Sequence, residues 1–454
     1  MALFVGINLI IKLLIFYNTT SFQVSEAGSN YSFLNAIESG KNPGLFYESY
    51  RSILAYIGYF FKKTTGTLDA FFWFHALIAT ISVYVLYRIC IRLTSKRTSA
   101  LFAVLLATIL MDYHLLTPVF YYQIFEIFFL LLVVYLGLVL IEGNNLMGSA
   151  AVLFIPAIIY FSMFFRGTLR YFQILLIGLS LFLIWKKRYR PAGGLAAVAI
   201  ITIGLFYLLP LDNYREKGSP TVNDFQFFGH TMYGGDGGEG AFIYKENEIR
   251  YQHRLKEFMA VRQYETLTVQ VRNEFQNREI KEFIIQTPLK WFYLQVRKVA
   301  LTFGIVPIRD SLEILATGKM SMKWYLGAFI IQIPYAMIIV AFVALTVLFF
   351  RISDLADARI LFIFLVLFYL IAATCLYGHY QERYRHVVIL AGMIPFMSVY
   401  FGRLFDRHAR TALSSKRKAF LVFIFIVLIL HWGYQAYSVL EVHRDRYVKA
   451  LEQF

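Results

Sequence analysis

Long apolar runs follow one another along most of the chain, with one long and more polar interruption at 212–324. A helix that crosses a bilayer needs roughly 20 mostly apolar residues, and about eleven segments come close to that length. These predicted spans are 2–17, 68–93, 98–112, 118–141, 147–165, 168–185, 193–211, 325–350, 359–377, 386–402 and 419–437. The pattern therefore predicts an all-α polytopic membrane protein in which residues 1–454 form a single transmembrane bundle.

The segment 288–308, PLKWFYLQVRKVALTFGIVPI, is apolar but carries Lys290, Arg297 and Lys298. Charged side chains are costly in the hydrocarbon layer, whereas an amphipathic helix at the membrane surface keeps them in water. We therefore predict an amphipathic helix that lies at the outer interface and does not cross the membrane. Counting it as a span would reverse the orientation of every later helix.

The short loops between the predicted spans are strongly basic. Lysine and arginine near the ends of spans accumulate on the cytoplasmic side of membrane proteins. With a cytoplasmic N-terminus, all the basic loops fall on that side: 92–97, 186–190, 402–418 and the loop flanked by Arg351 and Arg359. The outer face then holds the first loop, 18–67, the long segment 212–324 and the polar stretch 378–385.

Composition supports the membrane assignment and narrows the chemistry. The chain is 59% hydrophobic with a mean hydropathy of +0.58, whereas soluble proteins are about 45–50% apolar. Much of the net charge of +16 lies in the basic loops, so we expect no nucleic-acid partner. Cys90 and Cys375 fall inside apolar runs and predict neither a disulfide framework nor a metal site. The run 2–17 has no small-residue cleavage site and is expected to be the first span.

The first outer loop contains a carboxylate that could act as a catalytic base. Glu26 precedes the helical pattern YSFLNAI (31–37), which the turn residues SGKNPG (39–44) end. Glu26 is then expected at the mouth of the bundle, where a carboxylate could take a proton from an acceptor hydroxyl or amide. A helix-capping or solvated glutamate fits the same spacing.

Further ionisable residues lie near the outer ends of the predicted spans. Asp112 ends the third span, and Glu126 lies within the fourth, where an ionisable group is a candidate functional residue. A glutamate hydrogen-bonded to a neighbouring helix is the structural alternative for Glu126. Arg166 and Arg170 are four residues apart on one helical face, and guanidinium groups suit phosphate oxygens. Snorkelling to lipid headgroups is the alternative for this pair.

The polar residues HYQERYR (379–385) lie between two apolar runs and place two arginines at the outer start of a span. Arginine on the outer side runs against the positive-inside bias, which favours a functional role. Successive residues point in different directions on a helix, so one of Arg383 and Arg385 could face inward. A lipid-linked phosphate that arrives from the bilayer is the anion we expect there.

The order of these features resembles the GT-C membrane glycosyltransferases, in the bacterial branch similar to protein O-mannosyltransferases and the lipid A aminoarabinose transferase. Four stretches carry the resemblance: SEAGSNYSFLNAIESGKNP (25–43), FFRGTLRYFQILLIGLSLFLIWKKRYR (164–190), GHTMYGGDGGEGAFIY (229–244) with FIIQTPLKWFYLQVRKVALTFG (283–304), and ERYRHVVILAGMIPF (382–396). The resemblance implies a GT-C-like bundle with outer-face amphipathic helices in a bacterial inner membrane. It also implies transfer of a sugar from a polyprenyl-phosphate carrier to a lipid, glycan or protein acceptor on the periplasmic or exterior side.

The resemblance also implies roles for individual residues. The acidic residue in the family's first outer loop is the general base, and Glu26 matches it. The arginine after the fifth span matches Arg166, and the late Arg-Tyr pair, which would hold the carrier phosphate, matches Arg383 and Tyr384. Lys298 matches a basic residue of similar placement. The family often has an Asp-Glu pair in the first loop, whereas a serine precedes Glu26 here, which leaves the subfamily and the acceptor open.

These arguments predict an outer-face site with one base and several cations. The residues expected to contact the donor phosphate are Arg166, Arg170, Lys298, Arg383, Tyr384 and Arg385. The candidate substrate contacts are Asp112, Glu126, His379 and Tyr233 of the glycine-rich loop. The sequence contains no set of residues with metal-ligand spacing, so we expect no cofactor; a divalent metal is not indicated, and metal dependence stays open.

Two other functions fit part of the pattern. An oligosaccharide-repeat polymerase would share the outer arginines but use a lipid-diphosphate donor. A transporter or flippase of lipid-linked sugars usually has repeated halves and broken helices near the midplane, and the sequence shows no such repeat. A purely structural membrane protein would not need arginines on the outer side. The expected partners are therefore a polyprenyl-phosphate-linked sugar, its acceptor and membrane lipids.

Overall fold

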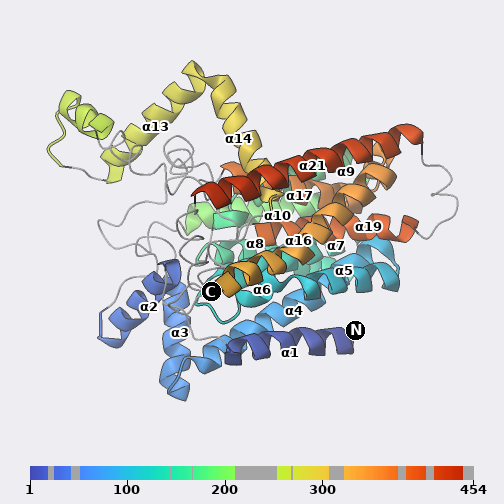
Figure 1. Ribbon diagram of the computed structural model, residues 1–454, viewed down its shortest axis with the longest axis horizontal. Coiled ribbons are helices and arrows are strands. Elements are labelled where there is room, and N and C mark those ends of the chain that lie inside the picture. The colour runs from blue at the N-terminus through green and yellow to red at the C-terminus, as the bar shows by residue number, and fades with distance from the viewer. Residues whose placement is uncertain are drawn as a thin grey trace.

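The computed structural model describes residues 1–18, 25–41, 52–143, 145–165, 167–209, 253–266, 269–305, 322–376, 385–404 and 414–442. Every regular element within these ranges is a helix (Figure 1). Seven helices of the described chain are long and apolar enough to cross a membrane, and four shorter apolar helices accompany them. The chain is therefore an all-α, multi-pass membrane protein, as the hydropathy pattern predicted.

Each predicted span corresponds to an apolar helix of the bundle. These helices are α1 (Ala2–Asn18), α4 (Asp69–Thr94), α5 (Arg97–Ile109), α7 (Gln123–Glu142), α8 (Asn145–Ser162), α9 (Phe172–Trp185), α10 (Tyr189–Leu208), α16 (Met322–Phe349), α17 (Ala358–Leu376), α21 (Ser415–Val442) and the continuous unit α18 (Arg385–Val388), η5 (Ile389–Met393) and α19 (Ile394–Leu404). The other elements are α2 (Ser25–Glu38), α3 (Ser52–Thr65), α6 (Met111–Leu115), η1 (Gly167–Leu169), α13 (Val269–Gln286), α14 (Pro288–Thr302) and η3 (Ile352–Ala356). That all the bundle helices cross the membrane stays a prediction.

Most helices begin or end a few residues away from the predicted bounds, and in the third and fourth predicted spans the backbone shows why. The predicted span 98–112 breaks at Leu110, whose backbone leaves the helical region at φ −74° and ψ 81° before the short helix α6. The predicted span 118–141 becomes helical only at Gln123. Pro118 has no N–H and restricts the residue before it, so the first residues of this run stay outside the helix.

The centre of the bundle is formed by α4, α7 and the α18–η5–α19 unit, whose side chains are mostly buried. Helix α17 packs against both α7 and the π-helical turn η5. A methyl group at Gly137 of α7 would lie 2.6 Å from the ring of Phe362. A methyl group at Gly392 of η5 would lie 2.9 Å from the side chain of Leu367. These two glycines let α17 approach closely, and close packing is a main source of helix association in membranes.

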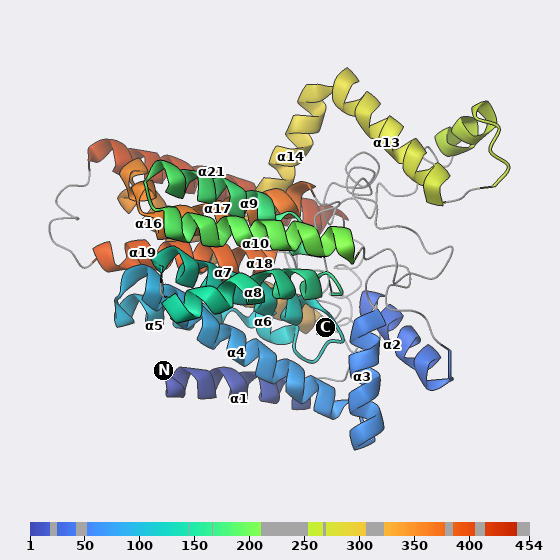
Figure 2. The same cartoon turned by 180° about the vertical axis from the view of Figure 1, so that it is seen from behind.

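Helices α13 and α14 project from one end of the bundle (Figures 1 and 2). Helix α14 corresponds to the predicted amphipathic helix, and it is not among the helices long and apolar enough to cross a membrane. Leu289, Phe292, Tyr293 and Val296 are exposed, and their spacing places them on one helical face. An exposed apolar stripe is typical of an interfacial helix, and contact with the membrane surface stays a prediction.

The basic loops meet at the opposite end of the bundle (Figure 2). Arg92 pairs with Glu142, and Arg188 donates to the carbonyl oxygen of Ile141 at 2.7 Å. Arg359 reaches the carbonyl oxygen of Arg92 at 3.1 Å. The loops 92–97, 186–190 and 351–359 therefore lie side by side around the end of α7.

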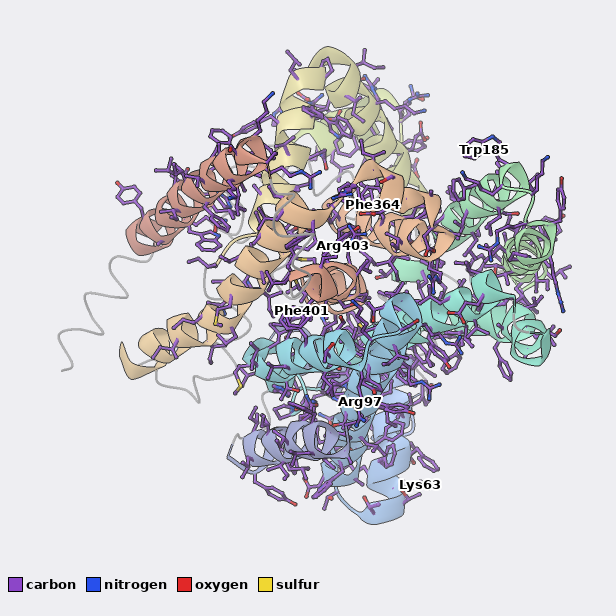
Figure 3. All side chains as sticks on the ribbon, turned by 90° about the vertical axis from the view of Figure 1, so that its right-hand side faces the viewer. Lys63, Arg97, Trp185, Phe364, Phe401 and Arg403 are labelled. Atoms are coloured by element: carbon purple, nitrogen blue, oxygen red, sulfur yellow. The ribbon has the colours of Figure 1, made fainter. Side chains whose placement is uncertain are left out.

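Arg403, labelled in the view onto this end (Figure 3), connects α19 to the loop between α16 and α17. Two of its nitrogens lie 2.8 and 3.0 Å from the carboxylate oxygens of Asp354. Arg417 of α21 donates to the carbonyl oxygen of Leu348 at 2.7 Å. The fourth basic loop thus joins the others, and the described parts of all four lie at one end, as their predicted common side requires.

We predict that Asp354→Asn lowers the free energy of unfolding by about 1 kcal/mol at pH 7, since it removes the carboxylate that accepts both Arg403 bonds. Partial burial raises the pKa of Asp354, but the hydrogen bonds from Arg403 and from the Arg351 N–H outweigh it and hold the pKa below the usual 3.8. A depressed pKa contributes stability above the usual value, and this contribution is lost as the pH falls through the folded-state pKa. Thermal unfolding in detergent at several pH values measures the difference.

The difference in the free energy of unfolding between the wild type and Asp354→Asn should therefore shrink towards zero as the pH falls below 3.8. Glu265→Gln changes an exposed carboxyl group elsewhere and serves as the control. It should have little effect on the free energy of unfolding at pH 7 or below pH 3.8. An Asp354→Asn protein as stable as the wild type at pH 7 would contradict the assigned role of the ion pair.

Candidate functional site

Helix α2, which carries Glu26 in its first turn, is docked on the end of the bundle opposite the basic loops. Asn30 is fully buried, and its amide nitrogen donates to the carbonyl oxygen of Phe120 at 2.5 Å. The ring of Tyr31 lies 5.2 Å from that of Phe120, and Leu34 is buried as well. Glu26 lies one helical turn before Asn30 on this docked helix.

Phe120 is the residue at which α2 and α3 meet the bundle. Its ring packs edge-to-face on Phe71 of α4, with 4.8 Å between the ring centroids. A methyl group at Gly58 of α3 would lie 2.6 Å from the same ring, so α3 passes directly over it. The segment that contains Phe120 leads within three residues into α7, and α2 is therefore fixed next to the N-terminal end of α7.

Glu126 lies in the first turn of α7 and is only 6% exposed. Thr168 of η1 donates its hydroxyl hydrogen to the Glu126 carboxylate. The carbonyl oxygen of Thr168 in turn accepts a hydrogen bond from the hydroxyl of Tyr369 of α17. Glu126 is thus hydrogen-bonded to a neighbouring segment, as expected if its role is structural. Its contact with a substrate stays a prediction.

Arg385 begins α18 and is 1% exposed. It donates to the carbonyl oxygen of Gly304 at 3.2 Å and to the side-chain oxygen of Gln332. Its guanidinium carbon lies 3.9 Å from the ring centroid of Tyr335, which is within the range of a cation–π contact. These contacts hold Arg385 inside the protein at a point where α18 also contacts α7 and α17.

Arg170 follows η1 directly and is partly buried, with its guanidinium carbon 5.9 Å from the ring centroid of Tyr171. Asp112 and Lys298 are placed through their backbones, in α6 and α14, but their side chains lie outside the described part of the chain, as does that of Glu26. The predicted site residues outside the described ranges are Arg166, Tyr233, His379, Arg383 and Tyr384. The structure therefore brings Glu126, Arg385 and the helix of Glu26 to one end of the bundle, and the remaining assignments stay predictions.

A buried lysine was missed by the sequence interpretation. Lys12 of α1 is fully buried, donates to the side-chain oxygen of Asn8, and has its ammonium group 5.3 Å from the ring centroid of Tyr113. Asn8 donates to the hydroxyl of Thr108 at 3.4 Å, and His114 lies 2.8 Å from the Thr108 carbonyl oxygen. A charged residue inside an apolar run was available as a signal, since the same rule singled out Glu126.

The described residues contain no candidate metal site. Within them, no group of three or more His, Cys, Asp or Glu side chains could hold a metal ion. The expectation that no cofactor takes part stays a prediction, because several acidic and histidine side chains lie outside the described ranges.

Comparison with known proteins does not assign the chain to a family. No protein-family model matches the chain, and no curated protein is significantly similar to it. The resemblance to GT-C glycosyltransferases therefore rests on the order and chemistry of the residues alone.

We predict that Thr168→Val lowers the free energy of unfolding by about 1–3 kcal/mol, because it withdraws a hydrogen bond from a buried carboxylate. Thr202→Val is the matched control: Thr202 is buried, but its hydroxyl only donates within its own helix, to the Val198 carbonyl oxygen. The control should cost less than Thr168→Val in thermal unfolding of the purified protein. Equal losses for the two valine variants would show that the bond to Glu126 contributes nothing particular.

Proposed function

We propose that the chain is a glycosyltransferase that moves a sugar from a polyprenyl-phosphate carrier to a lipid, glycan or protein acceptor at the outer face of a membrane. The observation that supports this most is the convergence at one end of α7. Helix α2, with Glu26, is anchored on the segment that enters α7, and α18, which directly follows Arg383 and Tyr384, also contacts α7. A base and a phosphate-binding cation would thereby face one reaction centre.

The proposed sugar transfer needs both a base and a phosphate-binding cation. The acceptor oxygen or nitrogen attacks the anomeric carbon of the sugar, and the bond from that carbon to the phosphate oxygen breaks. Glu26 takes the proton of the acceptor, which makes the attacking atom more nucleophilic. Arg383 stabilises the negative charge that develops on the departing phosphate, as fixed cationic groups do in a preorganised site.

The orientation belongs to the same proposal. The basic end of the bundle would face the cytoplasm, because arginine and lysine near span ends accumulate there. The end with α2, α13 and α14 would then face the periplasm or exterior of a bacterial inner membrane. This side is where a polyprenyl-phosphate sugar would meet an envelope polysaccharide, lipid or protein.

Glu26→Gln should reduce sugar transfer by at least about a hundredfold, because an amide cannot take up the proton. Mass spectrometry of lipids, glycans and proteins from cells that lack the chain first identifies the transferred sugar and its acceptor. Transfer is then measured in membranes with that donor. Glu38→Gln is the control on the same helix, since Glu38 forms an ion pair with Lys62 at 2.6 Å, and it should keep the wild-type rate. Normal turnover by Glu26→Gln would end the assignment of the base.

Arg383→Ala should raise the KM for the polyprenyl-phosphate sugar about tenfold or more, because a charge-assisted contact to phosphate is lost. Arg278→Ala is the control, since Arg278 is half-exposed on α13 and bonds to Glu282 at 2.8 Å. It should leave the KM unchanged. An unaltered KM for Arg383→Ala would remove its phosphate role, and preference for a lipid-diphosphate sugar would favour the polymerase alternative.

Single-cysteine labelling tests the orientation. In a protein with Cys90→Ala and Cys375→Ala, we expect Val261→Cys to react with a membrane-impermeant maleimide in intact cells. Ile352→Cys should react only after the membrane is opened. Val261 and Ile352 are 75% and 82% exposed, so accessibility to the reagent depends on the side of the membrane alone. The reverse labelling pattern would invert the orientation.

A further inference from the structure

The C-terminal end of α14 has a feature that its own residues do not explain. The last four carbonyl groups of a helix lack the usual partners four residues later, and where these groups are buried they need other donors. The segment 300–304, at the end of α14, supplies one donor itself, since the Phe303 N–H lies 3.0 Å from the Ala300 carbonyl oxygen, and it obtains the side-chain donors from three other helices. The side chains that donate to its carbonyl oxygens are His431 and Trp432 of α21, Tyr335 of α16 and Arg385 of α18.

We call the segment 300–304 with these four donors the α14 clasp. The indole N–H of Trp432 donates to the carbonyl oxygen of Phe303 at 2.9 Å. His431 lies 2.9 Å from the carbonyl oxygen of Ala300 through its Nε2 atom, which requires the proton on that nitrogen. The contribution of α21 therefore consists of two adjacent residues that reach two carbonyl oxygens of the same segment.

The other half of the clasp fixes Arg385. The hydroxyl of Tyr335 donates to the carbonyl oxygen of Thr302, and its ring lies under the guanidinium group of Arg385. Arg385 itself donates to Gly304. A change in the position of the segment 300–304 would therefore move two of the groups that orient Arg385.

Helix α21 is otherwise the most exposed of the helices long and apolar enough to cross the membrane. Its packing within the described chain is mainly on α16. Gln435, one turn after His431, is nevertheless 3% exposed, and a methyl group at Gly304 would lie 2.4 Å from its side-chain oxygen. A peripheral helix thus presents three polar side chains to the clasp, whereas a plain lipid-facing helix needs none.

We propose that α21 is a positioning element of the donor site. Through Trp432 and His431 it holds the segment 300–304, which orients Arg385 and so fixes the start of α18 that directly follows Arg383 and Tyr384. This inference rests on the proposed function, because the donor phosphate is what Arg383 would bind. Trp432, His431 and Tyr335 are positioning residues and touch no reacting group.

The first test measures the coupling without any reaction. Trp432→Phe keeps an aromatic ring but removes the N–H donor, and Arg385→Lys removes the guanidinium group. In thermal unfolding, the loss in Tm of the double variant should fall short of the sum of the single losses by about 2 °C or more, since both residues act on one segment. Tyr434→Phe changes an exposed aromatic residue of α21 and should combine additively with Arg385→Lys. Additive losses for the first pair would overturn the inference.

The second test uses the transfer reaction. Trp432→Phe and Tyr335→Phe should each raise the KM for the donor about fivefold, the effect of one lost hydrogen bond, while the KM for the acceptor stays unchanged. A merely structural role would lower the amount of active protein and leave both KM values as they are. Should Trp432→Phe fail to fold, Tyr335→Phe keeps the ring under Arg385 and takes its place in both tests.

The outcomes separate the inference from the proposed function. A wild-type protein that transfers no sugar from any polyprenyl-phosphate donor overturns both, even where the unfolding data show coupling. An active wild-type protein with unchanged donor KM in the variants overturns the inference alone.

Discussion

Polar groups that are buried on folding lose their contact with water and need partners within the protein. This requirement shapes both ends of the bundle. At the basic end, Arg188 and Arg417 donate to carbonyl oxygens near the ends of α7 and α16. At the other end, the carbonyl oxygens that close α14 are matched by side chains from α16, α18 and α21. Between these two layers the helices are held mainly by apolar contacts and close glycine packing.

The two polar layers differ in kind, and this difference bears on function. The basic layer joins neighbouring loops through ion pairs that are partly exposed, such as Arg403 with Asp354. The opposite layer contains buried polar side chains, among them Asn30, Glu126 and Arg385, whose partners come from distant parts of the chain. Buried and directional contacts of this type fix the positions of the side chains that make them. A reaction site needs such fixed positions, whereas basic loops that set the orientation in the membrane do not.

Much of the fold could be predicted from the sequence because span length and loop charge are local properties. The helix ends at Leu110 and Gln123 could not be placed by hydropathy, since leucine and the residues around Pro118 are as apolar as the spans they interrupt. The contacts of the candidate site were harder to predict from the sequence. The bond from Thr168 to Glu126 joins residues 42 positions apart, and the bond from Trp432 to Phe303 joins residues 129 apart, so neither leaves a local pattern. Lys12 was visible in its apolar run and needed only the rule already applied to Glu126.

The dependence of α14 on α21 has a consequence for biosynthesis. The ribosome completes α14 more than a hundred residues before it reaches Trp432. Throughout that interval the backbone at 300–304 lacks at least two of its four side-chain donors, because His431 and Trp432 are made last. Assembly of this end is thus a late event, and a chain truncated before the last helix would carry every other bundle helix and still lack the two donors of α21.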